Sequence, residues 1–185
     1  MELEGTQILH ATPQAVWQAL FDRAILEQAI PGCESLEQKS ETEFAAVVRL
    51  KVGPVSARFQ GEVTLTELEP FSACTLSGKG SGGIAGFAKG TARITLVDEG
   101  DVTVLSYRAE AAVGGKLAAL GNRLIKATAQ KLAGEFFAAF GALLPEEAGG
   151  DTGPEDAGEK RRETGGCGAV SRAGGPQIAG NGRTS

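Results

Sequence analysis

The stretch VSARFQGEVTLT (residues 55–66) alternates strictly between two kinds of residue. One face carries small or apolar residues, and the other carries polar ones: Val55, Ala57, Phe59, Gly61, Val63 and Leu65 against Ser56, Arg58, Gln60, Glu62, Thr64 and Thr66. A period of two residues indicates a strand with one face in a core and one face in water. The stretch therefore predicts an antiparallel sheet that is covered on one side.

The same period continues to both sides of this stretch. Residues 44–52 place Phe44, Ala46, Val48, Leu50 and Val52 on one face, and Gly53-Pro54 turns the chain into the next strand. Further strands are predicted from the same signal, at residues 3–11, 73–78, 92–96 and 105–113. Pro70 is expected to start the strand that follows it, and Glu99-Gly100 and Gly114-Gly115 are expected to be turns.

Two helical segments interrupt the strands, and a third follows them. Thr12-Pro13 predicts a helix start, with Trp17 on the apolar face, and a second short helical piece runs to Leu26. Residues 116–144 then have helical spacing, and their apolar face is broad: Leu117, Gly121, Leu124, Ile125, Thr128, Leu132, Phe136, Ala139 and Phe140. This helix must cover the sheet. We predict an α+β fold, a curved antiparallel sheet around a long C-terminal helix, with two short helices after the first strand.

Several positions that face inward are too small to fill a core. Ala46, Ala57, Gly61, Ala92, Ala109 and Ala111 alternate with larger apolar residues, so either the helix settles closely on the sheet or an apolar cavity remains. The sequence leaves both alternatives open. The expected lining of a cavity is Trp17, Phe59, Gly61, Ile94, Tyr107, Ala109, Leu117, Gly121, Leu124 and Thr128, with Ser77 as a further polar group if it points inward. Such a lining suits a hydrophobic or aromatic ligand.

The glycine-rich stretch GKGSGGIAGFAKG (78–90) is not a phosphate site. It lacks the GxxxxGK[ST] spacing, and no helix follows whose N-terminus could hold a phosphate. Glycines here permit bulges and strand bending. We expect Gly82, Gly83 and Phe87 to form a flexible mouth of the cavity.

Residues that could carry catalysis or bind a metal are sparse. His10 is the single histidine, and Glu62 and Glu110 fall on outward strand faces, so no catalytic residue and no metal site are predicted. Cys33, Cys74 and Cys167 are far apart and form neither a disulfide framework nor a zinc site. Cys33 has no basic neighbour in the sequence that would activate its thiol.

Composition divides the 185 residues into one domain and a tail. Residues 1–144 form the predicted domain, and residues 145–185 are rich in Gly, Pro and charge, which predicts disorder. The net charge of -5 gives no footprint for nucleic acid. No apolar run is long enough for a bilayer and no cleaved signal is recognisable, so we expect a cytoplasmic protein.

Four motifs resemble one known family. IPGCESLE (30–37), VGPVSARFQGEV (52–63), GKGSGGIAGFAKGTARITL (78–96) and VGGKLAALGNRLI (113–125) are similar, in this order, to the CoxG family of carbon monoxide dehydrogenase. The resemblance covers about residues 1–141. It implies the helix-grip fold of the START-like and polyketide-cyclase-like superfamily (SRPBCC).

The resemblance also implies a function. The family accompanies molybdenum hydroxylases, notably aerobic carbon monoxide dehydrogenase, and is thought to help recruit them to the inner face of the cytoplasmic membrane. It supplies no molybdenum, flavin or iron-sulfur ligands. The resulting hypothesis is an accessory protein, without a covalently bound cofactor, whose cavity binds a lipophilic molecule such as a quinone. It would assist electron transfer by a membrane-peripheral oxidoreductase.

Two alternatives stay open. A cyclase or dehydratase would need polar groups inside the cavity, for which Tyr107 and His10 are the candidates. A docking protein with a filled core would bind its partner through a sheet edge or the long helix. Phe137 projects to the polar face of that helix and is a candidate contact for a partner or a membrane.

Overall fold

The structure, a computed structural model, describes residues 1–145. Apart from Pro145, the predicted tail lies outside the described residues. The strands and helices follow the chain in this order: β1 (Glu2–Leu9), α1 (Pro13–Leu20), α2 (Arg23–Ala29), β2 (Cys33–Gln38), β3 (Glu43–Val52), β4 (Val55–Glu69), β5 (Ala73–Ser81), the 3₁₀ turn η1 (Gly83–Ala85), β6 (Phe87–Asp98), β7 (Thr103–Gly114), the 3₁₀ turn η2 (Ala118–Leu120) and α3 (Asn122–Leu143).

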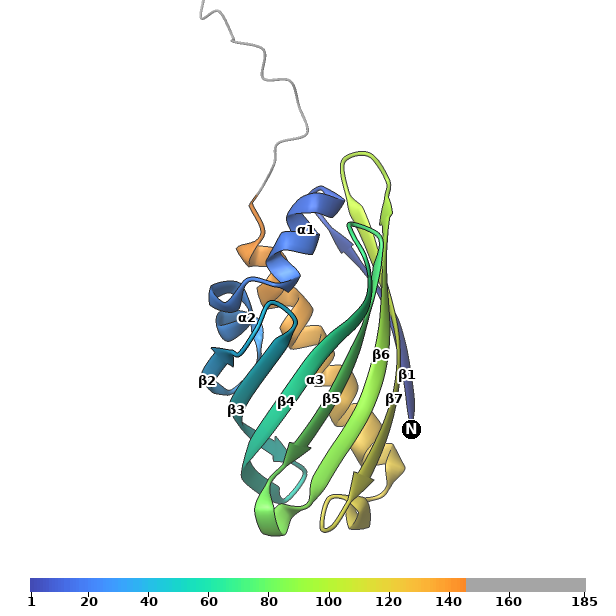
Figure 1. Cartoon of the computed structure of the whole chain (residues 1–185). Coiled ribbons are helices and arrows are strands. Elements are labelled where there is room, and N and C mark those ends of the chain that lie inside the picture. The colour runs from blue at the N-terminus through green and yellow to red at the C-terminus, as the bar shows by residue number, and fades with distance from the viewer. Residues whose placement is uncertain (146–185) are drawn as a thin grey trace, which may run out of the picture. The chain divides into compact units, whose positions relative to one another are not determined.

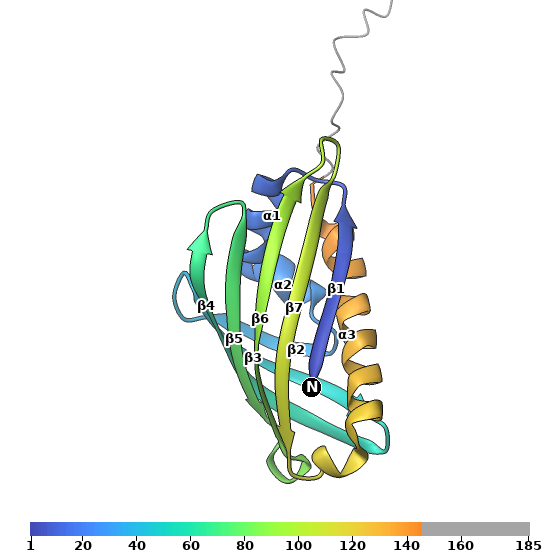
Figure 2. The ribbon, with the colours of Figure 1, turned by 90° about the vertical axis from the view of Figure 1, so that its right-hand side faces the viewer.

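One antiparallel sheet of seven strands contains all the strands, in the order β1-β7-β6-β5-β4-β3-β2. Strands β2 to β7 follow one another as hairpins, whereas β1 pairs with β7, with Leu3 opposite Ala109. The sheet bends around α3, which packs against α2, β1 and β3 (Figures 1 and 2). Helices α1 and α2 lie at one end of the sheet, the top in Figure 1, which we call the upper end.

Side-chain caps explain why α1 and α2 are separate helices. The Thr12 hydroxyl accepts a hydrogen bond from the Ala15 amide at 3.2 Å, and Pro13 occupies the first helical position. The Asp22 carboxylate accepts from the Ala24 amide at 2.8 Å and so begins α2. Both caps stop the preceding segment and restart the helix.

Helix α3 begins at Asn122, so the predicted start at Lys116 was wrong. Gly121 precedes the helix with φ 86°, a conformation that residues other than glycine rarely adopt. Before it, the Leu117 amide donates to the Ala85 carbonyl at 3.0 Å, which ties η2 to η1. This tertiary hydrogen bond holds residues 115–121 in a turn despite their helical spacing. Within residues 1–145 there is no helix both long and apolar enough to cross a bilayer.

Three further differences concern strands. Edge strand β2 was not predicted, because Leu36 is its single buried residue and alternation is lost. Pro70 lies in the β4–β5 turn rather than in a strand, next to Phe71 with φ 63°. Much of the glycine-rich stretch is strand, since Gly78 and Gly80 belong to β5 and Gly90 belongs to β6.

The core consists of two clusters. The larger one lies at the upper end and includes Val16, Leu105 and Phe140, which are completely buried. The smaller one lies at the opposite, lower end and contains Val52, Phe59, Ala85 and Leu117. Helix α3 reaches both, because Ile125 and Phe140 are buried near its two ends.

Phe137 and Leu124 have the opposite exposure to the one expected. Phe137 is buried and stacks on Tyr107 of β7, with ring centroids 5.4 Å apart, so it is not a surface contact. The sheet bends around the helix, and its β7 side covers a helix face that a flat sheet would leave in water. Leu124 is 36% exposed, beside the turn at Gly53.

Candidate functional site

Small residues form two adjacent rows across the inner face of the sheet. Residues directly opposite each other on neighbouring strands share a face, so the register defines the rows. They are Ala46, Gly61, Gly80 and Ala88 in one row, and Val63, Gly78, Gly90 and Ala111 in the next. With so little side-chain volume, the sheet cannot fill the space up to α3.

A hollow of about 480 Å³ lies between these rows and α3. This volume falls within the usual range for small-molecule sites, roughly 300–1,000 Å³. Ile125, Thr128, Ala129 and Leu132 form its helix side, and Phe59 and Leu117 belong to its wall at the lower end. The hollow therefore separates the two core clusters.

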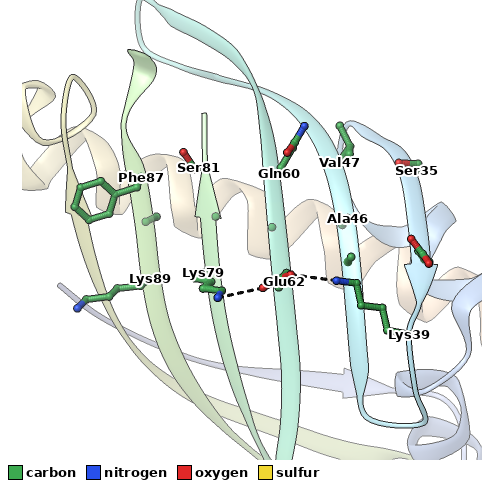
Figure 3. A pocket seen from close by; sticks show the side chains of 15 residues that line it. Ser35, Lys39, Ala46, Val47, Gln60, Glu62, Lys79, Ser81, Phe87 and Lys89 are labelled. Carbon is green, nitrogen blue, oxygen red and sulfur yellow. Dashed lines mark hydrogen bonds and ion pairs between the residues drawn. The ribbon is translucent and has the colours of Figure 1, made fainter. Parts of the chain in front are cut away.

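The lining of this hollow is almost wholly apolar. Among the described side chains that face it, only Thr128 is polar, and its hydroxyl donates to the Leu124 carbonyl at 2.9 Å. Glu62, Lys79 and Lys89 also border the hollow, but their side chains lie on the outer face of the sheet (Figure 3). Beside the glycines they contribute main-chain atoms. The hollow thus fits an apolar ligand better than a polar one.

A second, smaller hollow of about 220 Å³ adjoins the first toward α1 and α2. Ile30, Ala46 and Val63 line both hollows, so they form the boundary between them. The second hollow is bordered by large apolar residues and by Cys74, whose pKa is raised by burial. A chain-like ligand in the first hollow could extend into the second past Ile30.

The structure brings together half of the residues expected to line a cavity. Phe59, Gly61, Leu117 and Thr128 border the larger hollow, and Ile94 borders the smaller one. The other five lie elsewhere. Trp17 packs on Phe21 and Phe71, Tyr107 on Phe137, Ala109 pairs with Leu3 near the sheet edge, Gly121 precedes α3, and Leu124 is partly exposed.

The residues expected at a cavity mouth close the lower end instead. Gly82 lies against the Phe59 ring, so that even a Cβ atom would collide with it, and its amide donates to the Gly86 carbonyl at 2.8 Å. Gly83 begins η1 at φ 63°. Phe87 covers Gly114 from outside and is 51% exposed. Sequence reasoning missed the rows of Gly78, Gly80, Ala88 and Gly90, although their alternation with polar residues in 78–90 was visible.

Tyr107 and His10, the candidates for catalysis, are not brought together. Tyr107 is opposite Gly5, whereas His10 is exposed just beyond Leu9. At ~3.3 Å per residue, the four residues from Gly5 to Leu9 separate them by roughly 13 Å along β1. Ser77 pairs with Thr64 and Thr91 on the outer face, so it is not a polar group of the hollow.

A polar groove of about 640 Å³ on the outer face is larger but less suited to binding (Figure 3). There the Glu62 carboxylate accepts from Lys39 at 3.1 Å and pairs with Lys79 at 3.2 Å. These hydrogen bonds lower the pKa of Glu62. The polar groups thus satisfy one another in open solvent, where ion pairs contribute little.

Cys33, on the edge strand, is not an activated thiol. Partial burial raises its pKa, and the nearby Glu27 carboxylate raises it further. The thiolate is the nucleophile, so this thiol is less reactive than a free one at neutral pH.

The bent antiparallel sheet, the two short helices after β1 and the long helix α3 define a helix-grip protein of the START-like class. Within that class, the CoxG family of carbon monoxide dehydrogenase matches residues 5–144. The chain belongs to this family. The predicted fold class and the family resemblance are therefore confirmed.

Solved structures support the same assignment. A conserved protein from Geobacillus kaustophilus is 31% identical, with a TM-score of 0.72, and the match covers 77% of this chain and 93% of that one. The Zhui aromatase/cyclase from Streptomyces sp. R1128 is 15% identical, with a TM-score of 0.57 over 77% of this chain and 92% of the other, which shows a shared fold alone. A comparison with curated proteins found no match.

Proposed function

We propose that this chain is a non-catalytic accessory protein that holds a lipophilic small molecule between the sheet and α3. Its partner is a molybdenum hydroxylase of the carbon monoxide dehydrogenase type, which it serves at the inner face of the cytoplasmic membrane. The family supports the partner. The apolar hollow over the rows of glycine and alanine carries the ligand part of the proposal.

An isoprenoid quinone is the ligand that best combines these two lines. Its apolar chain gains about 0.8 kcal/mol per buried methylene, so it needs few polar anchors, in agreement with a lining whose one polar side chain is already engaged. The adjoining second hollow gives such a chain room to extend. A bound quinone that receives two electrons from the hydroxylase and two protons becomes a quinol, which links the partner to the respiratory pool.

A pair of helix variants tests ligand binding. Ala129 lines the larger hollow, whereas Ala127, on the same helix, is exposed. The fluorescence of the apolar probe 1-N-phenylnaphthylamine should rise with the wild-type chain and with Ala127→Phe, and decylubiquinone should displace the probe. Ala129→Phe fills the hollow and should bind the probe at least about tenfold more weakly, equivalent to ~1.4 kcal/mol.

Two results would count against this function. One is a wild-type chain that takes up neither probe nor decylubiquinone and carries no small molecule in native mass spectra after purification. The other is an Ala129→Phe variant that folds and binds the probe as tightly as Ala127→Phe, since binding would then lie outside the hollow.

A further inference from the structure

Three connections meet at the lower end of the sheet and form one surface, which we call the basic end. It comprises residues 51–56, 81–89 and 114–126, which lie together at the bottom of Figure 1. The hydrogen bond from the Leu117 amide to the Ala85 carbonyl joins two of the connections. Gly53 lies against the Leu124 side chain and joins the third.

The charges of the basic end all have one sign. It carries Lys51, Lys89, Lys116, Arg123 and Lys126, and its three segments contain no Asp or Glu. Within the described part of the chain, none of these five side chains forms an ion pair. The turns at the upper end are acidic instead, with Glu41, Glu67, Glu69, Asp98, Glu99 and Asp101. A net charge of -5 therefore conceals two ends of opposite sign.

The basic end also exposes its largest apolar side chain at its tip. Ile84 is 84% exposed, the most of any large apolar side chain among the described residues. Its backbone is held in η1 by hydrogen bonds from Gly82 to Gly86 at 2.8 Å and from Gly86 to Gly83 at 3.1 Å. Phe87 and Leu124 are partly exposed at the same end. An isoleucine held in water by a hydrogen-bonded turn indicates a contact surface.

We propose that the basic end docks on an anionic phospholipid surface, with Ile84 inserted among the headgroups. Five basic residues lie within the range of four to eight that is typical of segments that bind anionic lipid. They are spread over three connections around a narrow apolar tip. A fluid lipid surface can accommodate that arrangement, whereas a protein partner would need a matching rigid acidic cup.

This docking mode rests on the proposed function in one respect, because a lipophilic ligand is sparingly soluble in water and has to come from a bilayer. Phe59 and Leu117, which border the ligand hollow, belong to the core cluster directly behind the basic end. Ala85 of η1 belongs to the same cluster. Insertion of Ile84 would therefore place the end wall of the hollow next to the lipid.

Vesicle sedimentation with the full chain tests the docking surface. The wild-type chain should sediment with vesicles that contain phosphatidylglycerol and stay in solution with vesicles of phosphatidylcholine alone. Ile84→Ser should weaken vesicle binding at least about tenfold, since a buried isoleucine side chain is worth about that factor or more. Arg123→Glu should weaken it more than about fivefold, since it removes one basic charge and adds an acidic one.

Two matched controls separate the basic end from general stickiness. Ile8 is 64% exposed on β1, outside the basic end, so Ile8→Ser should leave vesicle binding unchanged. Arg108 is exposed on β7 and forms no ion pair within residues 1–145, so Arg108→Glu should have at most a small effect. Thermal melting of each variant confirms its fold.

The outcomes for docking and for ligand binding are distinct. Loss of vesicle binding in Ile84→Ser and Arg123→Glu, with probe uptake intact in solution, supports the docking surface. Equal sedimentation of these variants and the controls overturns it, as does a wild-type chain that ignores phosphatidylglycerol or binds an acidic partner protein instead. Vesicle binding without any probe uptake would leave docking standing and remove the ligand function.

Discussion

Thr103 is the first residue of β7, and it is completely buried. Its hydroxyl donates to the Ala11 carbonyl at 2.6 Å and so ties the sheet to the segment that enters α1. Thr103→Val keeps the shape of the side chain but leaves that carbonyl without its partner. We expect a loss of about 1–3 kcal/mol in the free energy of unfolding, measured by urea denaturation.

Thr66→Val is the matched control for this residue. Thr66 lies on the exposed face of β4, where the same change should alter the free energy of unfolding by no more than about 0.5 kcal/mol. Equal effects at the two positions would mean that the Thr103 hydroxyl has no special role.

At the scale of the element, α3 offers one kind of substitution with two opposite outcomes. Gly121 precedes the helix at φ 86° and ψ 149°, a region that alanine avoids, so Gly121→Ala should destabilise the protein by about 1–3 kcal/mol. Gly134 lies exposed within the helix with open space around it, so Gly134→Ala should stabilise it by about 0.5–1 kcal/mol. Thermal melting compares both with the wild-type chain, and destabilisation by both would refute the argument.

Elements with strong local periodicity could be predicted from the sequence, and those shaped by distant contacts could not. The alternation in 55–66 corresponds to β4, and Thr12-Pro13 marks the start of α1. Edge strand β2 buries one residue and so leaves no pattern. The start of α3 depends on the Leu117–Ala85 hydrogen bond, and the burial of Phe137 depends on how the sheet bends, neither of which is local information.

The site followed the same division. Phe59, Gly61, Leu117 and Thr128 could be placed in the hollow because strand and helix faces are periodic. Ala109 and Tyr107 have the correct face but lie toward the β1 edge, away from the space left by the glycine rows. Position along a strand depends on the register between strands, which a single sequence does not reveal.

At the scale of the whole molecule, the hollow and the partner have to act together. Purified carbon monoxide dehydrogenase supplied with carbon monoxide should reduce decylubiquinone faster when the wild-type chain is added. Ala129→Phe should not increase this rate, since it cannot hold the quinone, whereas Ile84→Ser should still do so without vesicles. Absorbance of the quinone follows the reaction. If Ala129→Phe increased the rate as much as the wild-type chain, the protein would act without carrying the ligand.

The pairing of β1 with β7 has a consequence for how the chain is made. Leu3 finds its partner Ala109 only after the intervening strands have been synthesised. At roughly 5–20 residues per second, the ribosome exposes β1 for several seconds before it can pair. Contacts so distant in sequence also slow folding. The polar residues that alternate along β1, Glu2, Glu4 and Thr6 among them, keep this waiting strand from pairing with other nascent chains.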